Sequence, residues 1–175
     1  MLFITTSRRP SIRTRTFIKE LERAIPGSKR IVRGKKSLDD LKEMMIRYGV
    51  SKLLVVDTKK GNPAVLRFYE LSLPYLKLIC SLYIRGISLQ VDVKRKITVS
   101  ELSIVNECGD ELSSYLHNLL TQFIPEQSLV IHERKGIKAY LCIECENGNY
   151  RLTFKNLFKK VIYPSIKISK IEFLK

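Results

Sequence analysis

Apolar and polar residues alternate along the chain in two periods, one typical of helices and one typical of strands. From Phe17 to Ile25, apolar residues recur at steps of three and four, which places them on one face of a helix that Pro26-Gly27 ends. A second stretch of this kind runs from Leu112 to Phe123 and stops before Pro125. The pattern therefore predicts two amphipathic helices, one in each half of the chain.

A shorter helix and a series of strands fill the rest of the pattern. Ser37 and Asp40 resemble a capping box for a helix that runs to Tyr48, and Gly49 ends it. Residues 58–63 read as a turn. Runs rich in β-branched and aromatic residues predict strands at Leu2–Thr6, Lys29–Val32, Lys52–Val56, Val65–Leu71, Leu76–Tyr83, Leu102–Val105, Leu129–His132, Ile137–Cys145, Tyr150–Asn156 and Ile166–Phe173. Helices and strands mixed in this order predict an α/β (α+β) fold.

The two long helices suggest a duplicated plan. When Ile25-Pro26 is set over Ile124-Pro125, two strand–helix–strand units superimpose, with Phe17 over Leu116. Two unrelated amphipathic helices can share this periodicity by chance, so that alternative stays open. The pattern favours two pseudo-symmetric halves.

The charge is unevenly distributed. The chain of 175 residues has a net charge of +15, from 32 Lys and Arg against 17 Asp and Glu. Residues 1–100 carry 22 cationic and 8 acidic residues, residues 101–150 carry 3 and 8, and residues 151–175 carry 7 and 1. Because a uniformly lysine-rich surface would not reverse its sign in one block, the charge indicates a polyanionic partner such as a nucleic acid.

The basic residues gather around the predicted first helix. The loop at residues 5–11 joins free backbone amides and hydroxyls to two guanidinium groups, which suits a phosphate. A second basic turn follows the helix, where Gly34 lets the backbone approach a ribose-phosphate chain. Helix capping by Ser7 or Ser11 with solvated arginines is the simpler alternative. The candidate RNA-binding residues are Ser7, Arg8, Arg9, Arg13, Arg15, Arg30, Arg33, Lys35 and Lys36.

The second half differs in charge. Its corresponding loop carries Glu107, Asp110 and Glu111, so only the first loop suits phosphate. The stretch Glu101–Glu126 has no Lys or Arg and is a candidate protein-binding face. Aromatic residues near the C-terminus are candidates for base stacking, although most aromatics at strand spacing belong to a core. They are Tyr150, Phe154, Phe158 and Tyr163.

The residues that carry catalysis or bind metals form no convincing set. His117 falls in a predicted helix, and His132 beside Glu133 has no nucleophile at a telling spacing. Cys142 and Cys145 lie on opposite faces of a predicted strand, so they would not share a metal without a bend. There is no P-loop or Gly-X-Gly-X-X-Gly motif. We therefore expect no enzyme activity, no metal, no cofactor and no small-molecule substrate.

The location of the protein follows from what the chain lacks. No apolar run is long enough to cross a membrane, and no signal peptide begins the chain. We expect a cytoplasmic protein that does not bind membranes, with its four cysteines reduced.

A string of residues near the N-terminus resembles the opening of Brix-domain proteins. The matching residues are Ile4-Thr5-Thr6-Ser7-Arg8, Pro10-Ser11, Phe17-Ile18-Lys19-Glu20-Leu21, Pro26, Arg30 and Arg33-Gly34-Lys35. Further matches are Leu54-Val55-Val56, Gly61-Asn62-Pro63, Leu66 and Leu73-Pro74. The resemblance is strong in residues 1–75 and thin afterwards, and Tyr75-Leu76-Lys77 stands where the family often has Gly-Pro-Thr.

The resemblance implies a fold and a function. It implies a single Brix domain over residues 1–175, with halves at approximately 1–97 and 98–175, each like the anticodon-binding domain of class II aminoacyl-tRNA synthetases. The short length resembles the compact archaeal members. The implied function is that of a non-catalytic factor that binds ribosomal RNA or its precursor in pre-rRNA processing and subunit assembly, alongside other assembly proteins. A basic protein–protein adaptor within an assembly complex and an RNA-modifying enzyme are the alternatives.

Overall fold

The computed structural model describes residues 1–124 and 135–174. In chain order its elements are β1 (Leu2–Thr6), α1 (Ile12–Ala24), β2 (Ser28–Arg30), α2 (Leu38–Arg47), β3 (Lys52–Lys59), β4 (Asn62–Ser72), β5 (Tyr75–Ser88), the short 3-10 helix η1 (Val91–Val93), β6 (Val99–Asn106), α3 (Glu111–Phe123), β7 (Ile137–Glu146), β8 (Asn149–Asn156) and β9 (Val161–Phe173). Among the described residues, no helix is both long enough and apolar enough to span a membrane.

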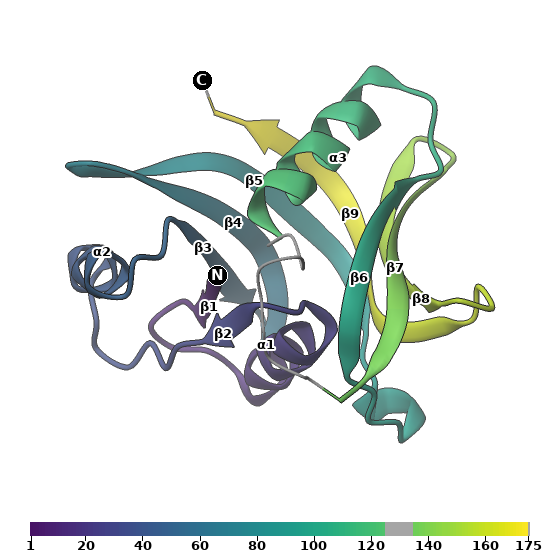
Figure 1. The fold of residues 1–175 in the computed structure, drawn as a ribbon, viewed down its shortest axis with the longest axis horizontal. Coiled ribbons are helices and arrows are strands. Elements are labelled where there is room, and N and C mark those ends of the chain that lie inside the picture. Colours follow the sequence, from purple (N-terminus) through teal and green to yellow (C-terminus); the bar gives the residue numbers. More distant parts are fainter. Residues whose placement is uncertain (125–134, 175) are drawn as a thin grey trace.

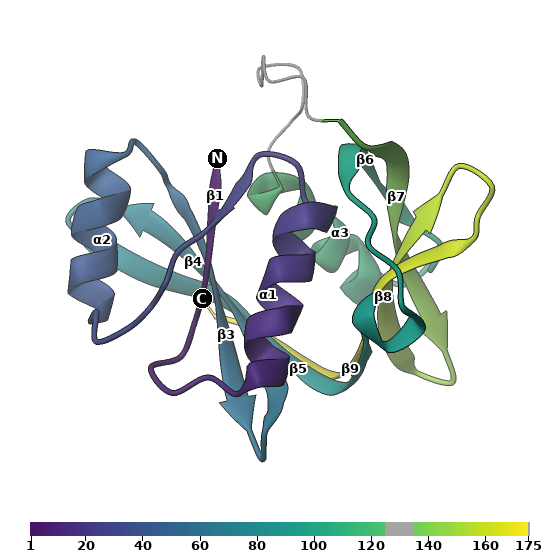
Figure 2. The ribbon, with the colours of Figure 1, turned by 90° about the horizontal axis from the view of Figure 1, so that it is seen from below.

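The strands form one curled sheet. Their order is β2-β1-β3-β4-β5-β9-β8-β7-β6. β1 runs parallel to β2 and β3, and β6 runs parallel to β7, whereas the other neighbours are antiparallel. The sheet curves around α1 and α3, as Figures 1 and 2 show. The fold is therefore mixed α/β, which confirms the predicted fold class.

α1 and α3 begin and end in the same way. Each has 13 residues, with Ser11 and Asp110 as N-caps whose side chains accept a backbone amide three residues on. At the other end, Ile25 and Ile124 each donate a backbone N–H to the carbonyl four residues before, at 2.8 Å. The sheet order also reads alike from each end toward the β5–β9 pair, apart from β2. The duplication into two halves stays a prediction, and these features support it.

Two clusters of buried side chains hold the layers together. The larger one joins α1 and α3 to the concave side of the sheet, where Phe17 and Leu116 are fully buried and Phe68 packs edge-on against Phe123 at 5.1 Å. The smaller one packs α2 through Leu41 and other residues against the opposite face of β1 and β3. Alternate residues of β1 and β3 thus face different clusters, as the pleat of a strand requires. α1 and α2 therefore cover opposite faces of these strands.

A polar junction connects α1 to the segment between β5 and β6. The buried Glu20 carboxylate accepts backbone N–H groups from Gln90 at 2.6 Å and Val91 at 3.0 Å. The buried Gln90 amide in turn donates to the carbonyls of Ile97 and Tyr163, both at 3.1 Å. Since Tyr163 belongs to β9, this network joins the first part of the chain to the last.

Several predicted strand boundaries differ from the structure. β2 ends at Arg30 and not at Val32, although the Ile31 N–H still donates to the Ile4 carbonyl of β1. β3 and β4 continue through most of the predicted turn at residues 58–63, because Lys60 and Gly61 both have a positive φ that suits a two-residue hairpin turn. The predicted strand Leu129–His132 lies outside the described residues.

Candidate nucleic-acid interface

The candidate interface lies at the edge of the sheet where parallel strands end. β1 is parallel to β2 and β3, so the loops that follow β1 and β2 leave the sheet on the same side as the end of β3. In open α/β sheets, ligands bind outside the carboxyl ends of such strands, where helices on opposite faces diverge. α1 and α2 diverge in this way beside β1, so the fold places both basic loops at a position suited to binding.

The first loop joins β1 to α1 and presents two free arginines. The backbone N–H of Ser7 donates to the Val56 carbonyl at 2.9 Å, which holds the start of the loop against β3. Ser11 ends the loop by accepting the Thr14 amide at 3.0 Å. Arg8 and Arg9 are exposed, and neither pairs with a carboxylate among the described residues. Ser11 therefore caps the helix while both guanidinium groups stay available to a ligand.

The second loop joins β2 to α2 and lies against the first. The Ile31 N–H donates to the Ile4 carbonyl at 2.8 Å, and the Thr5 hydroxyl donates to the Ile31 carbonyl at 2.8 Å. A tight turn follows, in which the Lys36 N–H donates to the Arg33 carbonyl at 3.1 Å and Gly34 has a φ of +53°. Because a glycine adopts this φ without strain, the turn brings Arg33 back against the sheet while Lys35 stays exposed.

Arg33 is buried at the junction of the two loops. Its side chain is 8% exposed, and its Nε and Nη1 atoms have no hydrogen-bond partner among the described residues. Burial, together with the positive charge of Arg8, lowers the pKa of the Arg33 guanidinium. A surface cavity of about 380 Å³ adjoins the side chain, lined by Ser7, Arg8, Arg33, Leu38, Val55, Asp57, Arg67 and Tyr69. Sequence reasoning placed Arg33 among the candidates but did not foresee its burial.

Two of the predicted RNA-binding arginines pair with carboxylates of the chain. Arg13 donates to both carboxylate oxygens of Asp92, at 3.1 and 2.9 Å, and this hydrogen bonding raises the pKa of Arg13. Arg30 lies 3.6 Å from a carboxylate oxygen of Glu22. A phosphate would have to displace these carboxylates, so both residues are less available than Arg8 or Arg9.

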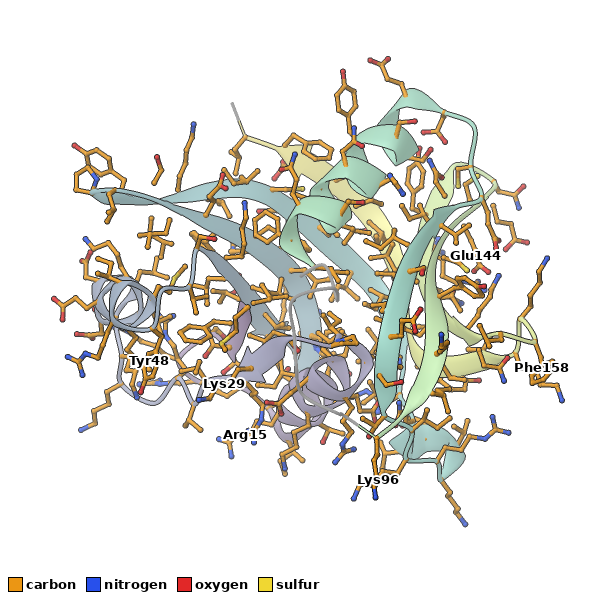
Figure 3. All side chains as sticks on the ribbon, viewed as in Figure 1. Arg15, Lys29, Tyr48, Lys96, Glu144 and Phe158 are labelled. Atoms are coloured by element: carbon orange, nitrogen blue, oxygen red, sulfur yellow. The ribbon has the colours of Figure 1, made fainter. Side chains whose placement is uncertain are left out.

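Further cations lie along the face formed by α1 and its neighbours. Figure 3 shows Lys29, Arg15 and Lys96 along one edge of the molecule, and Figure 2 shows this face with α1 in front. Arg15 has no carboxylate partner among the described residues, and Lys36 donates to the Val32 carbonyl at 3.3 Å. Of the candidates, Arg15 therefore lies exposed on this face, whereas Arg33 is buried.

An exposed aromatic side chain also lies near this face. Tyr48, at which the sequence pattern ends the second helix, is 59% exposed, and the Lys29 ammonium lies 5.6 Å from its ring centre. Its position directly after the last helical residue, Arg47, was the signal, because a chain often leaves the core where a helix ends. Tyr48, and Tyr69 in the wall of the cavity beside Arg33, are aromatic residues that the sequence analysis did not assign to the interface.

The predicted base-stacking aromatics have different environments. Phe154 is 1% exposed and belongs to the core, so the prediction is wrong for this residue. Tyr150 donates its hydroxyl to the Asp110 carboxylate at 2.6 Å. Phe158 is 83% exposed at the turn between β8 and β9, and Figure 3 shows it pointing away from the sheet. It lies far from the two basic loops, which come from the opposite end of the sheet.

Most of the acidic side chains before α3 form hydrogen bonds or ion pairs within the chain. Asp110 caps α3 and accepts the Tyr150 hydroxyl, and these hydrogen bonds lower the pKa of Asp110. Glu107 pairs with Lys155 at 3.3 Å, and Glu101 pairs with Lys138 at 2.8 Å. The exposed surface of this segment is therefore less acidic than its sequence indicates.

The cysteines form one local cluster of possible metal ligands. Among the described residues, ligand atoms of Cys108, Asp110 and Cys145 lie within 4.8 Å of one another. Asp110 already accepts two hydrogen bonds there, and burial with the neighbouring Cys145 raises the pKa of Cys108 to about 12. Cys142 is buried while Cys145 is exposed, as expected from opposite faces of a strand. His132 and Glu133 lie outside the described residues.

The fold occurs in solved structures of archaeal proteins. No protein-family model matches the chain. The crystal structure of a probable ribosomal biogenesis protein from Aeropyrum pernix superimposes with a TM-score of 0.80 and 26% identity, over 99% of this chain and 98% of that one. Mil, an archaeal Imp4-like protein, superimposes with a TM-score of 0.74 and 22% identity, over 99% of each chain. At this identity the second likeness shows the fold alone.

Sequence relatives define the family. A probable Brix domain-containing ribosomal biogenesis protein of Saccharolobus solfataricus is 34% identical over 167 residues, which is 92% of this chain and 94% of the relative. Proteins of the same description from A. pernix and Thermococcus kodakarensis are 40% and 39% identical, and the chain matches 48% and 45% of their lengths. The chain belongs to the Brix-domain family, which confirms the resemblance seen in its first 75 residues.

Proposed function

We propose that the protein is a ribosome-biogenesis factor that binds precursor ribosomal RNA without catalysing a reaction. The observation that carries this proposal is the pair of basic loops at the carboxyl ends of β1 and β2. They bring together Arg8, Arg9, Arg33 and Lys35, which have no carboxylate partner among the described residues. The names of its Brix-domain relatives supply the link to ribosome biogenesis.

Recognition would depend on the shape and backbone of the RNA. Cations on loops and on α1 suit phosphates, which position a protein without reading the base sequence. Ser7, Arg15 and Lys36 extend the proposed contact surface on either side of the loops, and Arg13 and Arg30 would contribute after exchanging their carboxylates for phosphates. The proposal includes two similar halves, each like the anticodon-binding domain of class II aminoacyl-tRNA synthetases, and a place in the cytoplasm.

Filter binding at several salt concentrations tests the proposal. If the protein neutralises about six phosphates, affinity for a structured rRNA fragment should fall by roughly a thousandfold between 50 and 200 mM salt. Replacing Arg8, Arg9 and Lys35 together by Ala should weaken binding and flatten this dependence, because three phosphate contacts are lost. The same charge change on β5 and β9, with Lys77, Arg85 and Lys167 replaced by Ala, is the matched control. Binding without a salt dependence, or an equal effect of both triple variants, would contradict the proposal.

A protein partner is the second candidate, and a specific surface favours it. The outer side of α3 exposes Leu112 and Tyr115, and the Tyr115 ring lies 6.0 Å from the ring of Phe173 in β9. We propose that this apolar patch, within the segment 101–126, contacts another assembly protein. Tyr115→Ala should then reduce co-purification of a protein partner while RNA affinity stays unchanged. Loss of RNA binding alone would contradict the assignment.

A further inference from the structure

Arg33 stands out because it is a buried cation with unpartnered nitrogen atoms. Removing a guanidinium from water is strongly unfavourable unless an anion or hydrogen-bond acceptors compensate. An arginine stays protonated in proteins, so it cannot avoid this cost by losing its proton. Among the described residues, neither its Nε nor its Nη1 atom finds an acceptor. The buried charge therefore points to a compensating group from outside the chain.

The nearby carboxylates are already engaged. Asp57, which lines the same cavity, accepts a hydrogen bond from the Arg67 Nε atom at 2.6 Å. Asp40 accepts the backbone N–H of Ser37 at 2.6 Å in the capping box of α2. The cavity wall thus holds three guanidinium groups, from Arg8, Arg33 and Arg67, against one carboxylate. The excess positive charge suits a small anion.

The position of the cavity agrees with this charge. Its wall combines the residues directly after β1 with residues of β3 and β4 and the first residue of α2. It therefore lies on the face of β3 and β4 that α2 covers, beside the loop that follows β1. In open α/β sheets, ligands bind outside the carboxyl ends of parallel strands such as β1. Its volume of about 380 Å³ falls within the usual range for small-ligand pockets.

We propose that this cavity binds a phosphate group, with Arg33 and Arg8 as its main ligands. Guanidinium groups bind phosphate oxygens through paired N–H donors, which a single ammonium group cannot reproduce. The Ser7 hydroxyl, which has no hydrogen-bond partner among the described residues, is a further donor from the wall. The inference deepens the proposed function and rests on it for the source of the phosphate, which is either a backbone diester or a terminal monoester of the RNA.

Thermal unfolding of the full chain with inorganic phosphate as the probe tests the site. The phosphate titration is run at constant ionic strength against chloride on the wild type and on Arg33→Met. The wild type should gain roughly 5 °C or more in melting temperature when phosphate is about a hundred times its dissociation constant. Arg33→Met should show no saturable gain, and in chloride it should melt above the wild type, because an apolar chain replaces an uncompensated charge.

Two further variants keep the test decisive. Arg8→Gln changes an exposed side chain, so it should fold normally and bind phosphate about tenfold more weakly. Arg85→Gln removes an exposed arginine of β5, outside the cavity and outside the proposed RNA contact surface, and should leave the phosphate response unchanged. If Arg33→Met and the wild type respond equally to phosphate, or if Arg8→Gln binds as tightly as the wild type, the inference is overturned.

Competition experiments with RNA oligonucleotides identify the source of the bound phosphate and separate this inference from the proposed function. An oligonucleotide with a 5′-phosphate that outcompetes its 5′-hydroxyl counterpart, in the wild type but not in Arg33→Met, assigns the cavity to a terminal monoester. Equal competition by the two oligonucleotides, again lost in Arg33→Met, assigns it to a backbone diester. Salt-dependent RNA binding without a phosphate response contradicts the proposed phosphate site and leaves the proposed function standing. A phosphate response without RNA binding contradicts the proposed function and leaves the anion site standing.

Discussion

The buried Glu20 carboxylate should contribute more to stability than other acidic side chains of α1 and α2. It is 3% exposed and accepts the N–H groups of Gln90 and Val91, so Glu20→Ala leaves both amides without an acceptor. An unsatisfied buried amide costs about 1–3 kcal/mol, which applies in full to Gln90 at 1% exposure, whereas Val91 is 55% exposed and its amide costs less. Because a carboxylate no longer has to be buried, part of this cost is offset, and we expect a net loss of about 2 kcal/mol. Total stabilities are about 5–15 kcal/mol, so the loss is large.

Urea unfolding followed by circular dichroism measures this loss. Glu20→Gln keeps one acceptor oxygen and should lose about half as much free energy of unfolding as Glu20→Ala. Glu43→Ala is the matched control, since Glu43 is exposed on α2 and forms no hydrogen bond or ion pair with the described residues. The control should change the free energy by less than about 0.5 kcal/mol. A loss of under about 1 kcal/mol in Glu20→Ala would refute the view that this carboxylate holds the junction between the two parts of the chain.

Two more predictions concern the core and the acid limit of stability. Leu116 is fully buried in α3, so Leu116→Ala should cost about 2–5 kcal/mol in urea unfolding, whereas Leu112→Ala, at a partly exposed position of the same helix, should cost much less. Hydrogen bonds from Arg13 and from the Leu89 amide hold the pKa of Asp92 below its usual value, so its contribution is present above the unfolded pKa of about 4 and is lost as the pH falls through the folded pKa. Asp92→Asn should therefore show a flatter decline in urea midpoint between about pH 5 and pH 2. An unchanged decline would contradict the assignment.

Local patterns along the chain were sufficient for most of the secondary structure. The helix ends at Ser11, Ser37 and Ile25 were predictable because capping and apolar periodicity depend on residues within one or two turns. The hairpin at Lys60-Gly61 was misjudged as a longer turn, because the strands on either side are extended by pairing with each other. Propensity alone does not report that pairing.

The clustering of basic residues in the first part of the chain was equally visible, but their individual states were not. Arg13 pairs with Asp92, which lies 79 positions away in the sequence, and Arg33 is buried because the loop after β2 folds back against β1. Each depends on the order of strands in the sheet, which brings distant segments together. Charge and periodicity are properties of neighbours in sequence, whereas ion pairing and burial are properties of neighbours in space, and the folded sheet alone makes Arg33 a buried cation beside a cavity.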